Sequence, residues 1–187
     1  MHHVIEKGMA FYWGTSEWTA QRIAAAIGIC EKNNWHKPVV EQPQYSMVKR
    51  EKFEREFHYI FEDYKYGSTI WSPLCQGILS GKYNDGSTPE GSRFEKDGNG
   101  ATFQRYFGPT KKESTVKMLN DLAALAKEIG CTQAQLALAW AIANKDTSVA
   151  LLGFTKIEQI HENLKALEVY QKWTSELEAK CDAILNN

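Results

Sequence analysis

The chain has 187 residues and a mass of 21.3 kDa, which is enough to bury a hydrophobic core without disulfide or metal cross-links. With 43% hydrophobic residues, 24% charged residues and a net charge of −1, its composition is that of an ordinary globular domain and argues against binding to nucleic acid or an anionic membrane. Because the sequence shows neither a signal-peptide core nor a run of apolar residues long enough to span a bilayer, we expect a cytoplasmic protein without membrane insertion.

Short strand-like runs alternate with helical patterns along the chain. An aromatic run at 11–13 predicts the first strand, and apolar residues at helical spacing follow it. Capping-box patterns at 132–135 and 155–158 predict the starts of two helices, and a last amphipathic helix is expected after Thr174. The other predicted strands are 38–42, 68–71 and 148–152, and helical spacing recurs in 53–64, 118–129, 136–143 and 157–167.

The alternation of strands and helices predicts the fold class. Strands that are separated by helical crossovers are parallel, and short apolar strands are typical of a parallel sheet covered on both faces. Both a doubly wound α/β sheet and part of a (β/α)8 barrel fit this pattern.

The cysteines and histidines follow no metal-binding spacing. The four cysteines are 45, 56 and 50 residues apart and include no C-x-x-C pair. Cys30 and Cys181 fall on apolar helical stripes, where we expect them to be buried. Because the five histidines form no H-x-x-x-H or H-E-x-x-H pattern, the sequence predicts neither a metal site nor a catalytic histidine.

Polar residues follow each predicted strand, at the sheet edge where α/β proteins place their active sites. The last strand leads through Gly153 and Thr155 into a helix, whose free N–H groups and positive dipole end favour an anion such as phosphate, although an ordinary helix cap also explains this pattern. Glu41 has the position of a general base, but nothing in the sequence pairs it with an acid. The four strand ends read Gly14-Thr15-Ser16, Glu41-Gln42, Trp71-Ser72-Pro73-Leu74-Cys75 and Gly153-Phe154-Thr155.

A long connection, 77–111, follows the third predicted strand. It holds seven of the 13 glycines together with Lys82 and Arg93, two cations that can bind phosphate. Connections of this length are usually binding loops, lids or flexible insertions. Because the last strand end independently offers an anion site, we expect a lid over an anionic ligand, with a solvated flexible insertion as the alternative.

Five motifs together resemble the aldo-keto reductases, and most closely the branch that contains the voltage-gated potassium channel β subunits. The resemblance runs from about Val4 to Leu185 and implies a (β/α)8 (TIM) barrel that binds NADP(H). It also implies that residues 1–187 are one partial domain, which lacks the first four βα units and keeps four βα units, the lid and an extra C-terminal helix. The motifs are 8–16, 41–45, 71–74, 80–83 and 152–155.

The resemblance also implies a role for individual residues toward the cofactor. Ser16 and Gln42 would contact the nicotinamide carboxamide, and Trp71 would lie near the ring. Ser72, Pro73, Leu74 and Cys75 would line the pyrophosphate path, with Ser80, Lys82 and Arg93 on the closing loop. The adenosine end with its 2′-phosphate would be held by Gly153, Thr155, Gln159, Glu162 and Asn163.

Three functional hypotheses follow from this resemblance. The family's catalytic Asp, Tyr, Lys and His or Asn belong to its first four strands, so no residue of this chain is assigned as a catalytic acid. The chain is therefore expected to be the cofactor half of a truncated or split NADPH-dependent oxidoreductase, which reduces a carbonyl to an alcohol when complete. Alternatively, it is a regulatory subunit that binds a potassium channel's cytoplasmic domain and senses NADPH/NADP, or a half barrel completed by a second copy. Glu17 stands where the channel branch tends to have a basic residue.

Overall fold

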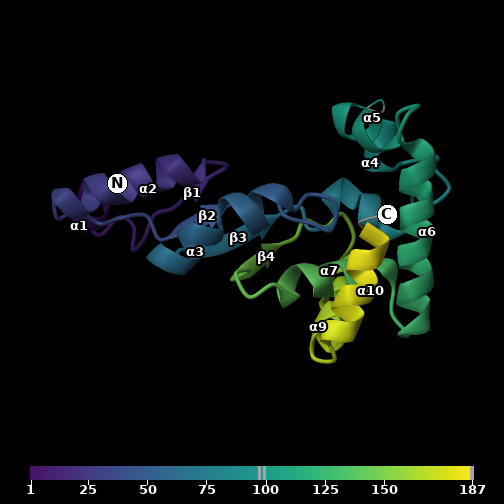
Figure 1. Cartoon of the computed structure of the whole chain (residues 1–187). Helices are drawn as coiled ribbons and strands as arrows, with labels where there is room; N and C mark the ends of the chain where they lie inside the picture. Colours follow the sequence, from purple (N-terminus) through teal and green to yellow (C-terminus); the bar gives the residue numbers. More distant parts are fainter. Residues whose placement is uncertain (97, 99, 186–187) are drawn as a thin grey trace. The chain divides into compact units, whose positions relative to one another are not determined.

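The computed structural model describes residues 1–96, 98 and 100–185, which form two compact units (Figure 1). Unit 1 consists of residues 1–73 and 144–152, and unit 2 of residues 74–143 and 153–187. Unit 1 is therefore discontinuous in sequence, and its last strand follows a long insertion that belongs to unit 2. No helix among the described residues is both long and apolar enough to cross a bilayer.

Unit 1 is built on an open sheet of four parallel strands in the order β1-β2-β3-β4. This confirms the predicted parallel α/β architecture. In the register, Thr15 pairs with Glu41, and Trp71 pairs with Leu151. The strands are β1 (Thr15–Ser16), β2 (Val40–Gln42), β3 (Gly67–Trp71) and β4 (Val149–Leu151).

The first strand lies after the aromatic run, so its predicted position at 11–13 is wrong. Phe11 and Tyr12 are 89% and 76% exposed, and the strand begins only at Thr15. Gly14 explains the position, because a Cβ atom built there would lie 2.4 Å from the Val40 carbonyl oxygen. Only glycine allows the two chains to approach closely enough for β1 to pair with β2.

The helices of unit 1 bury aromatic and aliphatic residues. Ile23 and Ile27 of α2 are buried, and Cys30 on the same stripe is also buried, as predicted. The helical segment predicted over 53–64 is divided: a π-helical turn, η1, carries Phe53 and is followed by a separate α-helix. The helices are α1 (His2–Glu6), α2 (Ala20–Lys32), η1 (Lys52–Glu56) and α3 (His58–Tyr64).

A serine clasp joins β3 to β4. The Ser68 backbone N–H donates to the Ser148 hydroxyl, and the Ser148 backbone N–H donates to the Ser68 hydroxyl, each at 3.1 Å. The Ser68 hydroxyl also donates to the carbonyl oxygen of Asp146 at 2.5 Å. Ser68 is fully buried, so these bonds satisfy polar groups that would otherwise be costly to bury.

Unit 2 consists of helices, and its central helix α7 is buried along most of its length. The predicted capping box at its start is confirmed: the Gln135 N–H donates to the Thr132 hydroxyl at 3.3 Å, and the Thr132 N–H donates to Gln135 Oε1 at 3.0 Å. Cys181 of the last helix is buried, also as predicted. The elements are η2 (Cys75–Ser80, 3-10), α4 (Arg93–Lys96), α5 (Ala101–Phe107), α6 (Lys112–Glu128), α7 (Gln133–Ala143), α8 (Ile157–Leu164), α9 (Ala166–Tyr170) and α10 (Ser175–Leu185).

The connection 77–111 contains the short helices α4 and α5 and an aromatic cluster of its own. Phe94 is 1% exposed, and its ring centroid lies 5.0 Å from that of Tyr83 and 5.5 Å from that of Phe103. Phe103 and Phe107 stack at 4.9 Å. The described part of this segment therefore contains a packed aromatic core and is not a solvated loop throughout; its positions 97 and 99 lie outside the described residues.

Candidate functional site

The carboxyl ends of β1 and β2 bring Ser16 and Gln42 together. The two residues are register partners, and the Ser16 hydroxyl donates to the Gln42 carbonyl oxygen at 3.0 Å. Both residues are exposed, which leaves the Gln42 side chain accessible to a ligand. An amide and a hydroxyl at neighbouring strand ends can together recognise a carboxamide, which both donates and accepts hydrogen bonds.

Glu17 links the same strand ends to Trp71. Glu17 Oε1 accepts from the Trp71 indole N–H at 3.0 Å and from the Gln44 backbone N–H at 2.6 Å, and Glu17 Oε2 is paired with Lys52 at 2.9 Å. Burial acts to raise the pKa of Glu17, but these hydrogen bonds, above all the one from Lys52, lower it below its ordinary value. Glu17 is therefore a carboxylate, and its hydrogen bond with the indole N–H holds the Trp71 ring.

Neither Glu17 nor Lys52 has a role that could be predicted from the sequence. The one sequence signal at Glu17 is that it stands where the channel branch that the chain resembles tends to have a basic residue. Its backbone is left-handed, with φ +58°, and the ion pair joins residues 35 positions apart. No local motif connects residues that far apart in the chain.

Glu41 points into unit 1 and is not exposed. Its Oε2 accepts from the Thr15 hydroxyl, and its Oε1 accepts from the Trp18 backbone N–H at 3.1 Å. Burial raises the pKa of Glu41 despite these hydrogen bonds. Because its oxygens are used to tie the loop after β1 to β2, the geometry gives Glu41 a structural role.

The turn after β3 contains several left-handed residues. Ser72 has φ +55° at the end of unit 1. Leu74, the first residue of unit 2, has φ −93° and ψ +10°, and Cys75 and Gln76 follow with φ +47° and +56°. Successive residues of opposite hand turn their N–H groups toward a common point, an arrangement that binds anions in many proteins. Cys75 is itself buried, so its backbone rather than its thiol is suited to face a ligand.

The two cations of the long connection each directly precede a residue of its aromatic cluster, Tyr83 or Phe94. Lys82 is exposed, with Nζ 5.0 Å from the centroid of the Tyr83 ring. Arg93 is exposed as the first residue of α4. The Ser80 hydroxyl donates to the Gly77 carbonyl oxygen at 2.6 Å, which closes the turn that precedes Lys82.

The capping box that was expected at 155–158 does not form, so this prediction is wrong. The N-cap is Lys156, without a side-chain cap, and Thr155 instead donates to Gln159 Oε1 through its N–H at 3.0 Å and its hydroxyl at 3.3 Å. The helix begins one residue later than predicted, so Gln159 rather than Glu158 faces Thr155. The resulting Thr155–Gln159 pair leaves the first turn of α8 without a side-chain cap.

The remaining adenosine-end residues lie before or on α8. Gly153 and Glu162 are exposed, and Asn163 is half-buried. The Glu162 carbonyl oxygen accepts from Gln135 Nε2 at 2.8 Å, which fixes α8 to the start of α7.

Unit 1 thus brings Ser16, Gln42 and Trp71 together at the ends of three adjacent strands, and Ser72 and Pro73 follow directly. Leu74, Cys75, Ser80, Lys82 and Arg93 belong to the first half of unit 2, and the Gly153–Asn163 group belongs to α8 and the turn before it. A cavity of about 630 Å³ elsewhere in unit 2, lined by residues such as Cys131, Lys172 and Lys180, has none of these predicted residues among its described lining.

Comparisons with known proteins relate the whole chain to one family. A family model described as "Aldo/keto reductase family" matches residues 1–186. The chain is 40% identical over 187 residues to a "Probable voltage-gated potassium channel subunit beta" of Oryza sativa subsp. japonica, with 100% of this chain and 56% of the relative covered. It is 44% identical over 186 residues to a "Putative voltage-gated potassium channel subunit beta" of Schizosaccharomyces pombe, with 98% and 52% covered. The chain spans about half the length of these curated relatives.

Proposed function

This chain belongs to the aldo/keto reductase family, whose fold is a (β/α)8 barrel, and we propose that it is the NADP(H)-binding half of such a barrel. The open sheet of four parallel strands corresponds to part of that barrel. When bound, NADPH supplies the hydride that reduces a carbonyl in the complete family fold. The observation that carries the proposal is the pairing of Ser16 with Gln42 at the carboxyl ends of adjacent strands, beside Trp71.

We assign the nicotinamide end of the cofactor to unit 1. The exposed Gln42 side chain and the Ser16 hydroxyl suit the carboxamide, and Glu17 holds the Trp71 indole so that the ring has a fixed orientation. Aromatic rings bind other flat rings through their faces, and an orientation set before binding lowers the entropy cost.

The phosphates are assigned to unit 2. The backbone changes hand between Leu74 and Cys75, as in an anion-binding turn, and Lys82 and Arg93 are exposed cations on the connection that follows. Arginine and lysine form their strongest hydrogen bonds with phosphate and carboxylate groups. For the adenosine end, Thr155, Gln159 and Asn163 offer hydroxyl and amide groups near the uncapped start of α8, where the helix dipole favours the 2′-phosphate.

The proposal predicts weak but saturable NADPH binding by the purified 187-residue chain. Replacing Lys82 with alanine is expected to lower the affinity at least about 10-fold, because a charge-assisted hydrogen bond contributes roughly 1.5–3 kcal/mol. Titration of the nicotinamide fluorescence measures both affinities. Lys172→Ala, which removes an exposed lysine from another part of unit 2, is the matched control and should bind like the wild type. Equal losses in both variants, or no saturable binding, would contradict the proposal.

A second function is favoured by the relatives' names, which describe voltage-gated potassium channel β subunits. We propose as the alternative that the protein binds the cytoplasmic domain of such a channel and senses the ratio of NADPH to NADP. Co-purification of the chain with a channel's cytoplasmic domain, with and without NADPH, tests this function. The expected result is association that changes with the redox state of the nucleotide; no association at micromolar concentrations would rule the alternative out.

A further inference from the structure

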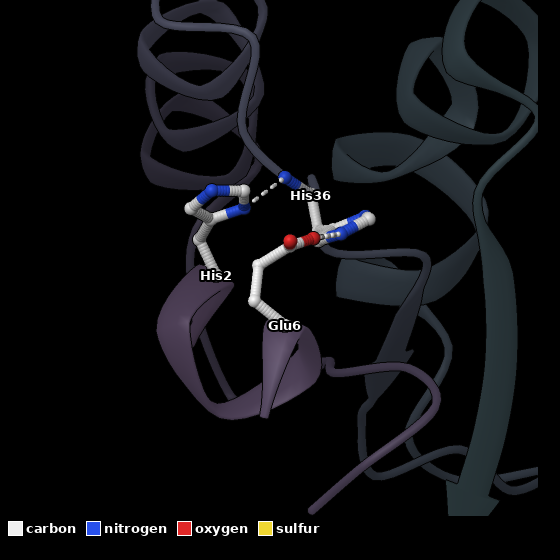
Figure 2. A group of neighbouring side chains, drawn as sticks. All are labelled: His2, Glu6 and His36. Carbon is white, nitrogen blue, oxygen red and sulfur yellow. Dashed lines mark hydrogen bonds and ion pairs between the residues drawn. The ribbon is translucent and has the colours of Figure 1, made fainter. Parts of the chain in front are cut away.

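Unit 1 brings together two histidines and a glutamate that lie far apart in the sequence (Figure 2). His2 and Glu6 are four residues apart on α1 and therefore lie on one face of that helix, while His36 belongs to the loop between α2 and β2. Each residue offers one ligand atom, and the three atoms lie within 4.8 Å of one another. This cluster could not be predicted from a sequence motif, because 34 residues separate the two histidines.

Contacts with neighbouring residues hold the two imidazole rings. The His36 backbone N–H donates to His2 Nδ1 at 3.3 Å, and His36 Nε2 lies 2.7 Å from Glu6 Oε1. The His36 carbonyl oxygen accepts from the Trp13 indole N–H at 2.8 Å, and the His2 ring stacks on Trp35 with 6.2 Å between centroids. The contacts from Trp13 and Trp35 come from outside the three residues, and such outer contacts orient ligating groups before a metal binds and reduce the ordering cost of binding.

The donor set has the chemistry of a zinc site. Two imidazole nitrogens and one carboxylate oxygen are a ligand set of tetrahedral Zn²⁺ sites that keep a fourth position open, whereas Ca²⁺ and Mg²⁺ prefer oxygen ligands alone. Metal–ligand distances of about 2.0–2.1 Å place tetrahedral ligand atoms about 3.3 Å apart. The ligand atoms are at most 4.8 Å apart, so the half-buried His2 and the exposed Glu6 and His36 would approach one another by side-chain rotation when a metal binds.

We propose that His2, Glu6 and His36 bind a divalent transition metal ion of the Zn²⁺ type, with water at the fourth position. The metal takes the place of any proton between His36 Nε2 and Glu6 Oε1, and that proton leaves to solvent. The bound ion would tie α1, a helix of only five residues, to the loop before β2.

Zn²⁺ alone is the probe that tests the site. The untagged 187-residue chain, first treated with a chelator, is titrated with Zn²⁺ in competition with a chromophoric zinc indicator. We expect the wild type to bind one equivalent of Zn²⁺ tightly. The affinity for Zn²⁺ should fall at least about 10-fold in His36→Ala and in Glu6→Ala. His3→Ala is the matched control, because His3 neighbours His2 on α1 but lies outside the cluster. An equal loss in His3→Ala would assign the zinc to the chain terminus and overturn the proposal.

Hydrogen exchange provides a readout that does not depend on affinity. Zn²⁺ should slow amide exchange in α1 and in the 33–37 loop of the wild type. The reason is that the ion binds only when α1 and this loop lie together, and so stabilises that arrangement. The same addition should leave exchange in His36→Ala unchanged. Circular dichroism confirms that the variants fold, as expected for substitutions at exposed positions. Zinc protection that is the same in the wild type and in His36→Ala would contradict the site.

Discussion

Replacing Phe94 with alanine is expected to lower the free energy of unfolding of unit 2 by about 3–5 kcal/mol. The Phe94 side chain is 1% exposed and contacts the rings of Tyr83 and Phe103, so its removal leaves a cavity in the aromatic cluster of the 77–111 connection. Lys82 and Arg93 are the sequence neighbours of Tyr83 and Phe94. The substitution should therefore also weaken NADPH binding, because both cations would lose their fixed positions.

Urea unfolding and amide hydrogen exchange measure this effect. Exchange in α4 and α5 should become faster in Phe94→Ala, and the unfolding midpoint of unit 2 should fall. Phe11→Ala makes the same chemical change at a side chain that is 89% exposed and should alter stability by less than about 0.5 kcal/mol. Similar stabilities of the two variants would show that the connection is not packed around Phe94.

Carbonyl reduction is expected to be absent in the chain alone and to appear when a chain with the first four βα units is supplied. The family resemblance places the general acid on those strands. The edge strands β1 and β4 each pair on one side only within the described structure, so both offer hydrogen-bonding groups to further parallel strands. The proposed companion would pair with both edges and close the barrel.

Co-expression with the remaining part of the rice relative tests this expectation, since the present chain covers 56% of that protein at 40% identity. NADPH oxidation with an aldehyde is followed for each half alone and for the mixture. The control is a variant of the rice half in which the catalytic tyrosine is replaced by phenylalanine. This variant should still assemble with the present chain but should not catalyse the reaction. If the intact halves associate but oxidise no NADPH, the proposed division into a cofactor half and a catalytic half is wrong; if the present chain is active alone, the general acid lies within it.

Local patterns predicted the fold best where the interactions are themselves local. The capping box at Thr132 and Gln135 needs only a spacing of three residues, and it forms as predicted. The aromatic run at 11–13 has high strand propensity, yet β1 begins at Thr15, because the close approach of Gly14 to Val40 decides where pairing begins. That approach joins residues 26 positions apart and has no local signal.

In the candidate site, too, the local features could be predicted and the long-range contacts could not. The strand ends could be predicted from the pattern, and the structure pairs Ser16 with Gln42 there. The Glu17 carboxylate that holds Trp71 could not be predicted, since its partners come from three different segments. In the 77–111 connection, the high glycine content favours a loop, whereas the aromatic residues that form its core are widely spaced and follow no local pattern.

The serine clasp between β3 and β4 has a consequence for the nascent chain. Ser68 and Ser148 are 80 residues apart, so β3 leaves the ribosome well before β4, the second of its two partner strands, is synthesised. At about 5–20 residues per second, the interval is roughly 4–16 s. During that time the Ser68 backbone is available to other strands, while residues 74–143 are the first part of unit 2 to be synthesised. Cotranslational folding of that insertion would bring Ser148 toward β3, so helix formation in one unit would control how long the other exposes the open edge of β3.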